Sequence, residues 1–167
     1  MTTKYLIKNV DVSGVISDIA IENELITAIG SNLQVEGATE FDFTGSVALP
    51  GLVDLHTHLR EPGKEDAETV LSGSQAAARG GFTAISAMAN TSPVADTAGV
   101  VEQVYRLGQS AGLVDVFPVG AVTQGIQGEH LAEIGAMADS AARVRVFSDD
   151  GNCVFDPLLM RRALEYI

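Results

Sequence analysis

The feature that most constrains the fold is a strand–helix unit that recurs about every 30 residues after Pro50. Apolar, strand-like runs begin at Leu52, Phe82, Val114 and Val144, so that successive starts are 30, 32 and 30 residues apart. A stretch with helical patterning follows each run. Strands that alternate with helices indicate βα units and a parallel sheet.

The expected boundaries come from apolar runs, glycine breaks and capping residues. The expected strands are 52–58, 82–90, 114–122 and 143–148, and the expected helices are 67–79, 97–108, 129–140 and 157–167. Asp156 directly precedes Pro157, which is typical of an N-cap followed by the first helical residue.

Residues 1–49 are expected to form a separate, small β-rich module of the sandwich type. Short runs rich in Ile, Leu and Val predict strands at 5–8, 16–22, 25–29, 40–43 and 47–49, with a hairpin turn at 22–24. No cluster of candidate catalytic residues lies in this segment. The predicted domains are therefore the β module, 1–49, and the βα domain, 50–167.

Two sheet closures fit four βα units: a doubly wound sheet and a (β/α)8 TIM barrel. A doubly wound sheet would carry a glycine-rich phosphate loop after its first strand, and neither common form of that loop occurs there. A barrel carries its chemistry at the carboxyl ends of its strands. Polar residues gather at those ends in this chain: His56, His58, Asn90, Thr123, Asp149 and Asp150.

We therefore expect an α/β chain that forms the first half of a TIM barrel. A complete barrel needs about 250 residues, and residues 50–167 number only 118. We accordingly expect this chain to be the N-terminal part of a longer polypeptide.

The composition excludes several classes of protein. Hydrophobic residues make up 46% and charged residues 19%, which is globular usage. Ten basic residues against 22 acidic ones give a net charge of −12, which disfavours nucleic acid as a partner. No membrane span or signal peptide is visible, and a single cysteine, Cys153, is typical of a cytoplasmic protein.

His56-Thr57-His58 is the sharpest chemical signal in the chain. Strand side chains alternate between faces, so both imidazoles are expected on one side, roughly 7 Å apart at Cα. Two ring nitrogens could then reach one ion at about 2.0–2.1 Å, the usual zinc–histidine distance. The alternative is a pair of structural histidines, but the chain has only three histidines, which favours a metal site.

Ser148-Asp149-Asp150-Gly151 closes the fourth predicted strand. A carboxylate pair before glycine is often only a turn. The strand phase places Asp150 on the barrel-lining face and Asp149 on the opposite face. Asp150 is therefore expected to point into the mouth of the barrel, at the carboxyl ends of its strands, as the two histidines do.

Arg60 and Asn90 are candidates for holding a substrate carboxylate. Arg60 lies two residues beyond His58, and a guanidinium can bind a carboxylate with two parallel hydrogen bonds. Asn90 ends the second strand and could donate its amide to the same group. The alternatives are a solvated arginine and an ordinary strand-ending asparagine.

Residues 50–63, Pro-Gly-Leu-Val-Asp-Leu-His-Thr-His-Leu-Arg-Glu-Pro-Gly, closely resemble the signature of the dihydroorotase family, among the cyclic amidohydrolases of the amidohydrolase superfamily. Residues 77–83, 90–91 and 147–151 match its bacterial class I branch, and the resemblance covers essentially the whole chain. One departure is Ala89, which stands where the family usually has proline, although Asn90 is kept.

The resemblance implies a zinc-dependent enzyme that interconverts N-carbamoyl-L-aspartate and L-dihydroorotate in pyrimidine biosynthesis, with two Zn²⁺ per complete active site. His56 and His58 would bind one ion, Asp150 would bridge both, and His58, Arg60 and Asn90 would contact the substrate. The catalytic, proton-shuttling aspartate would lie beyond residue 167, so the chain alone is expected to be inactive.

Two kinds of alternative remain. Hydantoinase (dihydropyrimidinase) and allantoinase use the same barrel, but they generally bridge their metals with a carboxylated lysine on the fourth strand. The lysines here are Lys4, Lys8 and Lys64, far from that strand. The other alternative is a non-catalytic, dihydroorotase-like partner of a transcarbamoylase.

The partner expectations are a small-molecule substrate, a homo-oligomer and an association with aspartate transcarbamoylase, with neither nucleic acid nor membrane. Three residues keep open or ordinary roles. His130 is expected in the first turn of the third helix, Cys153 in a loop, and Asp54 either as a structural aspartate or as a residue that orients an imidazole.

Overall fold

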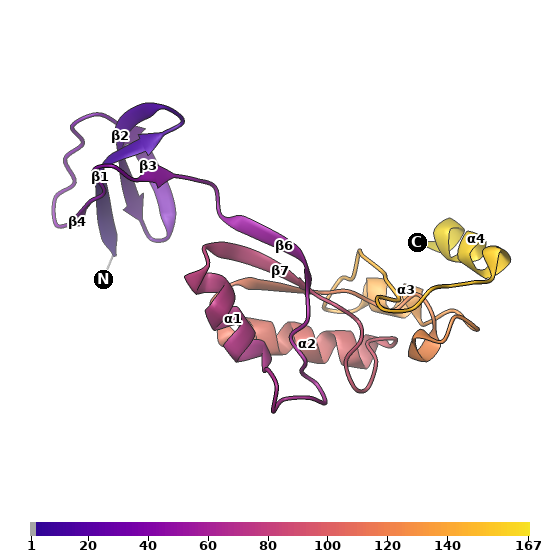
Figure 1. Ribbon diagram of the computed structural model, residues 1–167. Helices are drawn as coiled ribbons and strands as arrows, with labels where there is room; N and C mark the ends of the chain where they lie inside the picture. Colours follow the sequence, from indigo (N-terminus) through magenta and orange to yellow (C-terminus); the bar gives the residue numbers. More distant parts are fainter. Residues whose placement is uncertain (1–2) are drawn as a thin grey trace. The chain divides into compact units, whose positions relative to one another are not determined.

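The computed structural model describes residues 3–167 and divides into two compact units, Met1–Pro50 and Gly51–Ile167. Figure 1 shows both units and labels most of their helices and strands. Within the described residues, no helix combines the length and the apolar character that crossing a membrane requires.

The first unit is one mixed sheet of five strands. These are β1 Lys4–Val12, β2 Val15–Glu22, β3 Leu25–Gly30, β4 Thr39–Asp42 and β5 Val47–Ala48. The order is β3-β2-β1-β4, and β5 pairs with β1 further along the same edge. A small β-rich module is thus present, and its strands belong to one sheet rather than to the two sheets of a sandwich.

Local sequence explains the turns and core of this sheet. Asn23 and Glu24 both have positive φ, 50° and 67°, as the tight turn between β2 and β3 requires. Leu6, Val10 and Ile19 are buried and form the centre of the unit. The predicted hairpin at residues 22–24 is therefore confirmed.

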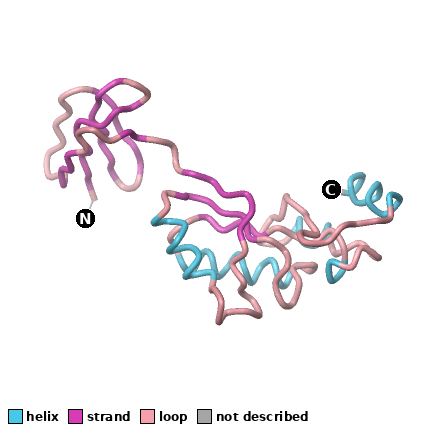
Figure 2. The backbone as a smooth tube through the Cα atoms, in the orientation of Figure 1, coloured by secondary structure: helices cyan, strands magenta, loops and turns pink. Residues whose placement is uncertain are grey.

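The second unit contains a parallel sheet of three strands in the order β6-β7-β8. The strands are β6 Leu52–Thr57, β7 Phe82–Ala87 and β8 Asp115–Pro118. Both pairings are parallel, as the repeat predicted. Figure 2 shows the three strands side by side, with helices along one side of them.

Two helices cover this sheet. Helix α1, Val70–Arg79, packs against β7, and helix α2, Ala98–Ala111, packs against β8. Their contact face includes Val70, Val104 and Val116, all of which are buried. Alternating strands and helices with a buried apolar layer between them confirm the predicted α/β class.

Helix α1 begins three residues later than predicted because Thr69 caps it. The Thr69 hydroxyl accepts the Ser72 N–H at 3.0 Å, and the Ser72 hydroxyl accepts the Thr69 N–H at 3.0 Å. This reciprocal capping box fixes Val70 as the first helical residue. At the end of α2, Gly112 adopts φ 61°, the left-handed conformation that stops a helix.

The later boundaries need three corrections, the first being that β8 ends at Pro118 rather than at 122. Residues 143–148 were predicted as a strand, but only an isolated parallel bridge between Gly120 and Phe147 is formed, so the pairing is too short to count as a strand. The third helix is α3 Ile134–Asp139, shorter than 129–140, and a 3-10 turn, η1 Gln124–Ile126, precedes it. In contrast, α4 Pro157–Tyr166 begins where predicted, and the Asp156 carboxylate caps it.

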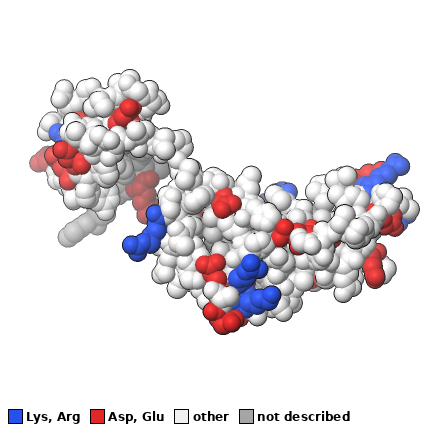
Figure 3. Space-filling view, in the orientation of Figure 1, with Lys and Arg blue, Asp and Glu red and all other residues white. Residues whose placement is uncertain are grey.

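Charged groups are dispersed on the surface. In the face shown in Figure 3, acidic and basic side chains alternate with uncharged surface on each unit. The excess of acidic residues thus does not form one continuous patch on the visible face of either unit.

Gly108 tests the packing of α2 on β8. A Cβ atom at Gly108 would lie 2.5 Å from the Val116 Cβ, whereas a Cβ at Gly99 in the same helix meets nothing within 4 Å. We expect Gly108→Ala to lower the free energy of unfolding by about 1–3 kcal/mol through overpacking. Gly99→Ala should instead raise it by up to about 1 kcal/mol, because alanine favours the helix. Urea denaturation of both variants checks this, and equal effects would contradict the packing.

Candidate metal centre

Strand β6 places the two histidines. Within this extended segment, Thr57 turns to the sheet and its hydroxyl donates to the Ser86 carbonyl at 2.8 Å. The flanking His56 and His58 consequently share the other side, with ring centroids 5.2 Å apart and planes at 67°. The predicted alternation of side chains is therefore present at the end of β6.

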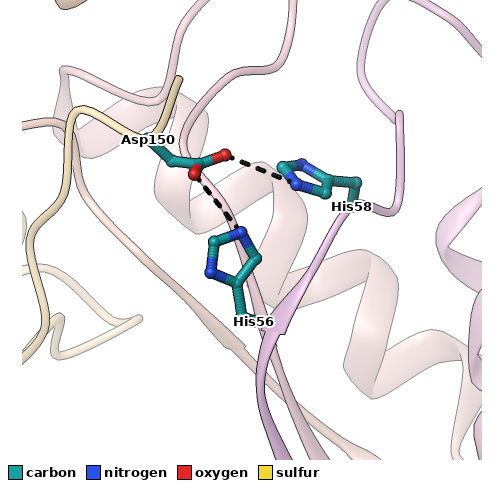
Figure 4. Close-up of side chains that lie close together, drawn as sticks. All are labelled: His56, His58 and Asp150. Carbon is teal, nitrogen blue, oxygen red and sulfur yellow. Dashed lines mark ion pairs between the residues drawn. The ribbon is translucent and has the colours of Figure 1, made fainter. Parts of the chain in front are cut away.

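Asp150 joins the histidines from the segment that pairs with Gly120. Its Oδ1 lies 3.3 Å from His56 Nε2, and its Oδ2 lies 3.4 Å from His58 Nε2. Figure 4 shows the carboxylate with one oxygen directed at each imidazole. The structure thus brings together the three residues that the sequence proposed as metal ligands.

The donor set fits a zinc ion. One ligand atom from each of His56, His58 and Asp150 can be chosen so that all lie within 4.8 Å of one another. Ligands at 2.0–2.2 Å from a tetrahedral ion would be separated by roughly 3.3–3.6 Å. Each imidazole Nε2 lies at such a distance from one Asp150 oxygen, but from a different oxygen in each case, so the side chains would have to adjust to surround a single ion.

Asp149, the neighbour of Asp150, has a different environment. It is buried, and its Oδ1 accepts the backbone N–H groups of Val122 and Thr123 at 2.8 and 3.0 Å. The Thr123 hydroxyl, itself fully buried, donates to Asp149 Oδ2. Asp149 therefore anchors the chain just before Asp150 to the segment after β8.

From sequence alone, Asp149 and Thr123 were assigned no role beyond their place at strand ends. The signal that could have revealed one was strand phase. Because Asp149 points away from the mouth, its carboxylate must find partners inside the protein. The adjacent loop, with Thr123, supplies them.

Asn90 follows β7 and also reaches the centre. Its Oδ1 lies 2.9 Å from His58 Nδ1, and its Nδ2 donates to Asp150 Oδ2 at 3.3 Å. In this structure, the amide therefore contacts two candidate ligands. The sequence had predicted only a substrate contact for it.

Arg60 lies in the loop that leaves β6. It is half-buried, has a left-handed φ of 63°, and its carbonyl accepts the Lys64 N–H at 3.0 Å. Among residues 3–167 no hydrogen bond is recorded from its guanidinium. In the same loop the Gly63 N–H donates to Glu65 at 2.7 Å, and this hydrogen bond lowers the pKa of the Glu65 carboxyl.

The structure also shows the surroundings of Asp54, His130 and Cys153. Asp54 accepts the His56 backbone N–H at 3.0 Å, so its recorded contact is with the chain rather than with an imidazole ring. His130 is exposed, as expected, but it lies outside α3, and its predicted place in a first helical turn is wrong. Cys153 is an exposed loop residue and lines, together with Asp150, a surface hollow of about 540 Å³.

Solved structures define the class of the fold. The chain is similar to an L-hydantoinase (dihydropyrimidinase) from Arthrobacter aurescens, with a TM-score of 0.62 and 24% identity, over 75% of this chain and 29% of that one. It is also similar to a dihydropyrimidinase from Brevibacillus agri, with a TM-score of 0.55 and 30% identity, over 72% and 28% of the two chains. The fold is therefore that of the N-terminal part of an amidohydrolase TIM barrel.

Sequence comparison defines the family. Residues 45–165 match the family model described as "Dihydro-orotase-like", and the chain belongs to that family. It is 61% identical over 166 residues to a dihydroorotase of Streptomyces coelicolor and 67% identical over 151 residues to one of Leifsonia xyli. The matches cover 99% and 90% of this chain, but only 39% and 34% of the lengths of the two relatives.

Asp149 offers a test of how the centre is built. We expect Asp149→Ala to lower the free energy of unfolding by about 3 kcal/mol, because buried N–H groups of Val122 and Thr123 lose their acceptor. Asp149→Asn keeps an oxygen for them and should cost less. Asp66→Ala, at an exposed position, is the control and should change stability by less than about 0.5 kcal/mol. If urea denaturation shows Asp149→Ala matching that control, Asp149 is not an anchor.

Proposed function

We propose that this chain is the metal-binding part of a dihydroorotase, which interconverts N-carbamoyl-L-aspartate and L-dihydroorotate in pyrimidine biosynthesis. The observation that carries the proposal is the convergence within 4.8 Å of Asp150 with His56 and His58, the two histidines of the motif His-x-His-x-Arg-Glu-Pro-Gly. Relatives named dihydroorotase, 58–67% identical to this chain, support it.

The proposal assigns some of these residues to metal binding and others to substrate binding. When bound, zinc supplies a Lewis acid that polarises a carbonyl and lowers the pKa of water toward about 7. His56 and His58 would hold one ion through neutral imidazole nitrogens, and the Asp150 carboxylate, which has one oxygen near each imidazole, would bind beside them and be shared with a second ion. Arg60, Asn90 and His58 bind the substrate, with the Arg60 guanidinium pairing with its carboxylate.

The ring-opening and ring-closing steps also need groups that this proposal assigns to later strands. One is the aspartate that moves the proton. Among residues 3–167, one cluster of three metal-ligating side chains is found, and it uses a single carboxylate. We propose that residues 1–167 alone bind zinc weakly and do not turn over dihydroorotate.

A hydantoinase-type activity is the alternative that the structural neighbours raise. A carboxylated lysine near residue 150 would be its signature, and no lysine occurs between residues 65 and 167. The side chain that converges with the two histidines is the Asp150 carboxylate instead, which favours the dihydroorotase assignment. A non-catalytic partner of a transcarbamoylase is disfavoured because the chain keeps its candidate ligands.

The proposal includes the cellular setting. The exposed, unpaired Cys153 supports a reducing cytoplasm. Exposed apolar side chains on β6 and β8, namely Val53, Leu55 and Phe117, support self-association into a homo-oligomer. An association with aspartate transcarbamoylase is the proposed contact with a second protein.

The third histidine provides a matched control for metal binding. We expect His56→Ala and His58→Ala each to lose most zinc affinity, because each removes one of three ligands, whereas His130→Ala should bind zinc like the parent chain. Competition with a chromophoric chelator measures the affinities. Parent-like affinity in both His56→Ala and His58→Ala would refute the metal centre.

A substitution of Arg60 tests its proposed contact with the substrate carboxylate. In a protein that joins this chain to the remaining barrel strands, we expect Arg60→Lys to raise KM and lower kcat/KM for dihydroorotate about 10-fold or more, since an ammonium cannot make the two-pronged contact. Zinc content should not change. Arg162→Lys, at an exposed position on α4, is the control. Kinetics equal to those of the control would instead support the alternative that Arg60 is a solvated arginine with no role in substrate binding.

A further inference from the structure

The Asn90 side chain connects two candidate ligands that come from different parts of the chain. Its Oδ1 lies 2.9 Å from His58 Nδ1, and its Nδ2 lies 3.3 Å from Asp150 Oδ2. His58 follows β6, Asn90 follows β7, and Asp150 follows the segment paired with Gly120. One amide therefore connects residues at the carboxyl ends of three parallel segments.

Hydrogen-bond chemistry fixes which way each group faces. An ionised carboxylate can only accept, so Asp150 requires the NH₂ end of the Asn90 amide. The amide oxygen is then left for His58, and because that oxygen can only accept, His58 Nδ1 must carry a hydrogen. In a neutral imidazole this leaves the lone pair on Nε2.

The lone pair points to a place where a cation would be held. His58 Nε2 lies 3.4 Å from Asp150 Oδ2, so in the neutral Nδ1–H tautomer two electron-pair donors face each other without a proton between them. This arrangement is repulsive by itself and favourable around a divalent ion. His56 differs, since no hydrogen bond to its Nδ1 is recorded among residues 3–167, and its side chain is 54% exposed against 28% for His58.

The backbone holds Asn90 firmly enough for this role. The Met88 N–H donates to the Thr57 carbonyl at 2.9 Å, which ties the end of β7 to the end of β6. Ala89 is fully buried, and its carbonyl accepts the Ala95 N–H at 3.0 Å. Asn90 therefore projects from a fixed segment rather than from a loose loop.

We propose that Asn90 is a positioning residue of the metal centre, which locks His58 in the Nδ1–H tautomer, presents its Nε2 to a divalent metal, and aligns the Asp150 carboxylate. The inference rests on the proposed metal centre and adds a role that precedes substrate binding. The Asn90 NH₂ group has a second hydrogen, so the amide can still donate to a substrate carboxylate.

The first test is the tautomer of His58 in the metal-free chain. With only three histidines, ¹⁵N-labelled imidazoles can be assigned by the loss of one signal set in each His→Ala variant, and exposed His130 is an internal reference. At a pH where the imidazoles are neutral, we expect His58 to be Nδ1–H in the parent chain. Asn90→Ala should shift it toward the Nε2–H form.

The second test is zinc affinity, measured by chelator competition without substrate. We expect Asn90→Ala to weaken binding about 10–100-fold, the usual effect of removing the hydrogen-bond partner of a metal-binding histidine. Thr91→Ala is the matched control, because the hydrogen bond of the half-buried Thr91 hydroxyl goes to the Pro93 carbonyl and not to the candidate ligands. It should leave both the tautomer and the affinity unchanged.

The outcomes separate this inference from the proposed function. If the parent chain binds no zinc, the metal centre fails, whatever the tautomer. If it binds zinc and Asn90→Ala keeps the Nδ1–H tautomer or the parent affinity, the positioning role is overturned. Should Asn90→Ala not fold, Asn90→Asp still provides an acceptor for Nδ1–H, and loss of that tautomer in Asn90→Asp would equally overturn it.

Discussion

The parallel pairing of β6 with β7, and of β7 with β8, is the constraint on which the candidate site depends. In a parallel sheet all strands run the same way, so their carboxyl ends meet at one edge. His58 follows β6 and Asn90 follows β7, while the Gly120–Phe147 bridge extends the same arrangement toward Asp150. Residues more than 90 positions apart in sequence thereby come within hydrogen-bonding distance.

The two adjacent aspartates illustrate how one strand phase produces two functions. Asp149 turns inward and is satisfied by Val122 and Thr123, so its charge is compensated by the protein itself. Asp150 turns to the mouth, where its recorded partners are two imidazoles and an amide. Fixing Asp149 therefore limits where Asp150 can lie, and this link couples the stability of the fold to the geometry of the site.

Much of this arrangement could be predicted from local sequence. The period of about 30 residues predicted the parallel sheet, and the alternation in His56-Thr57-His58 predicted that both imidazoles lie on one side. The phase of residues 144–150 predicted which aspartate faces them. These inferences held because they depend on backbone periodicity, which survives changes in tertiary packing.

Other features could not be read in the same way. The start of α1 depended on a capping box between Thr69 and Ser72, and the weak pairing of residues 143–148 depended on contacts with the segment around Gly120. The contacts of Asn90 with His58 and Asp150 join three separate segments, so no local sequence pattern predicts them. Side-chain networks of this kind require the fold before they can be recognised.

The most direct test of the central claim is the anomalous scattering of zinc in crystals of the chain soaked with Zn²⁺. The account predicts a peak at the zinc absorption edge about 2.0–2.2 Å from His56 Nε2, His58 Nε2 and an Asp150 oxygen. A zinc peak elsewhere in the chain, or none between these three ordered side chains at saturating zinc, would contradict it.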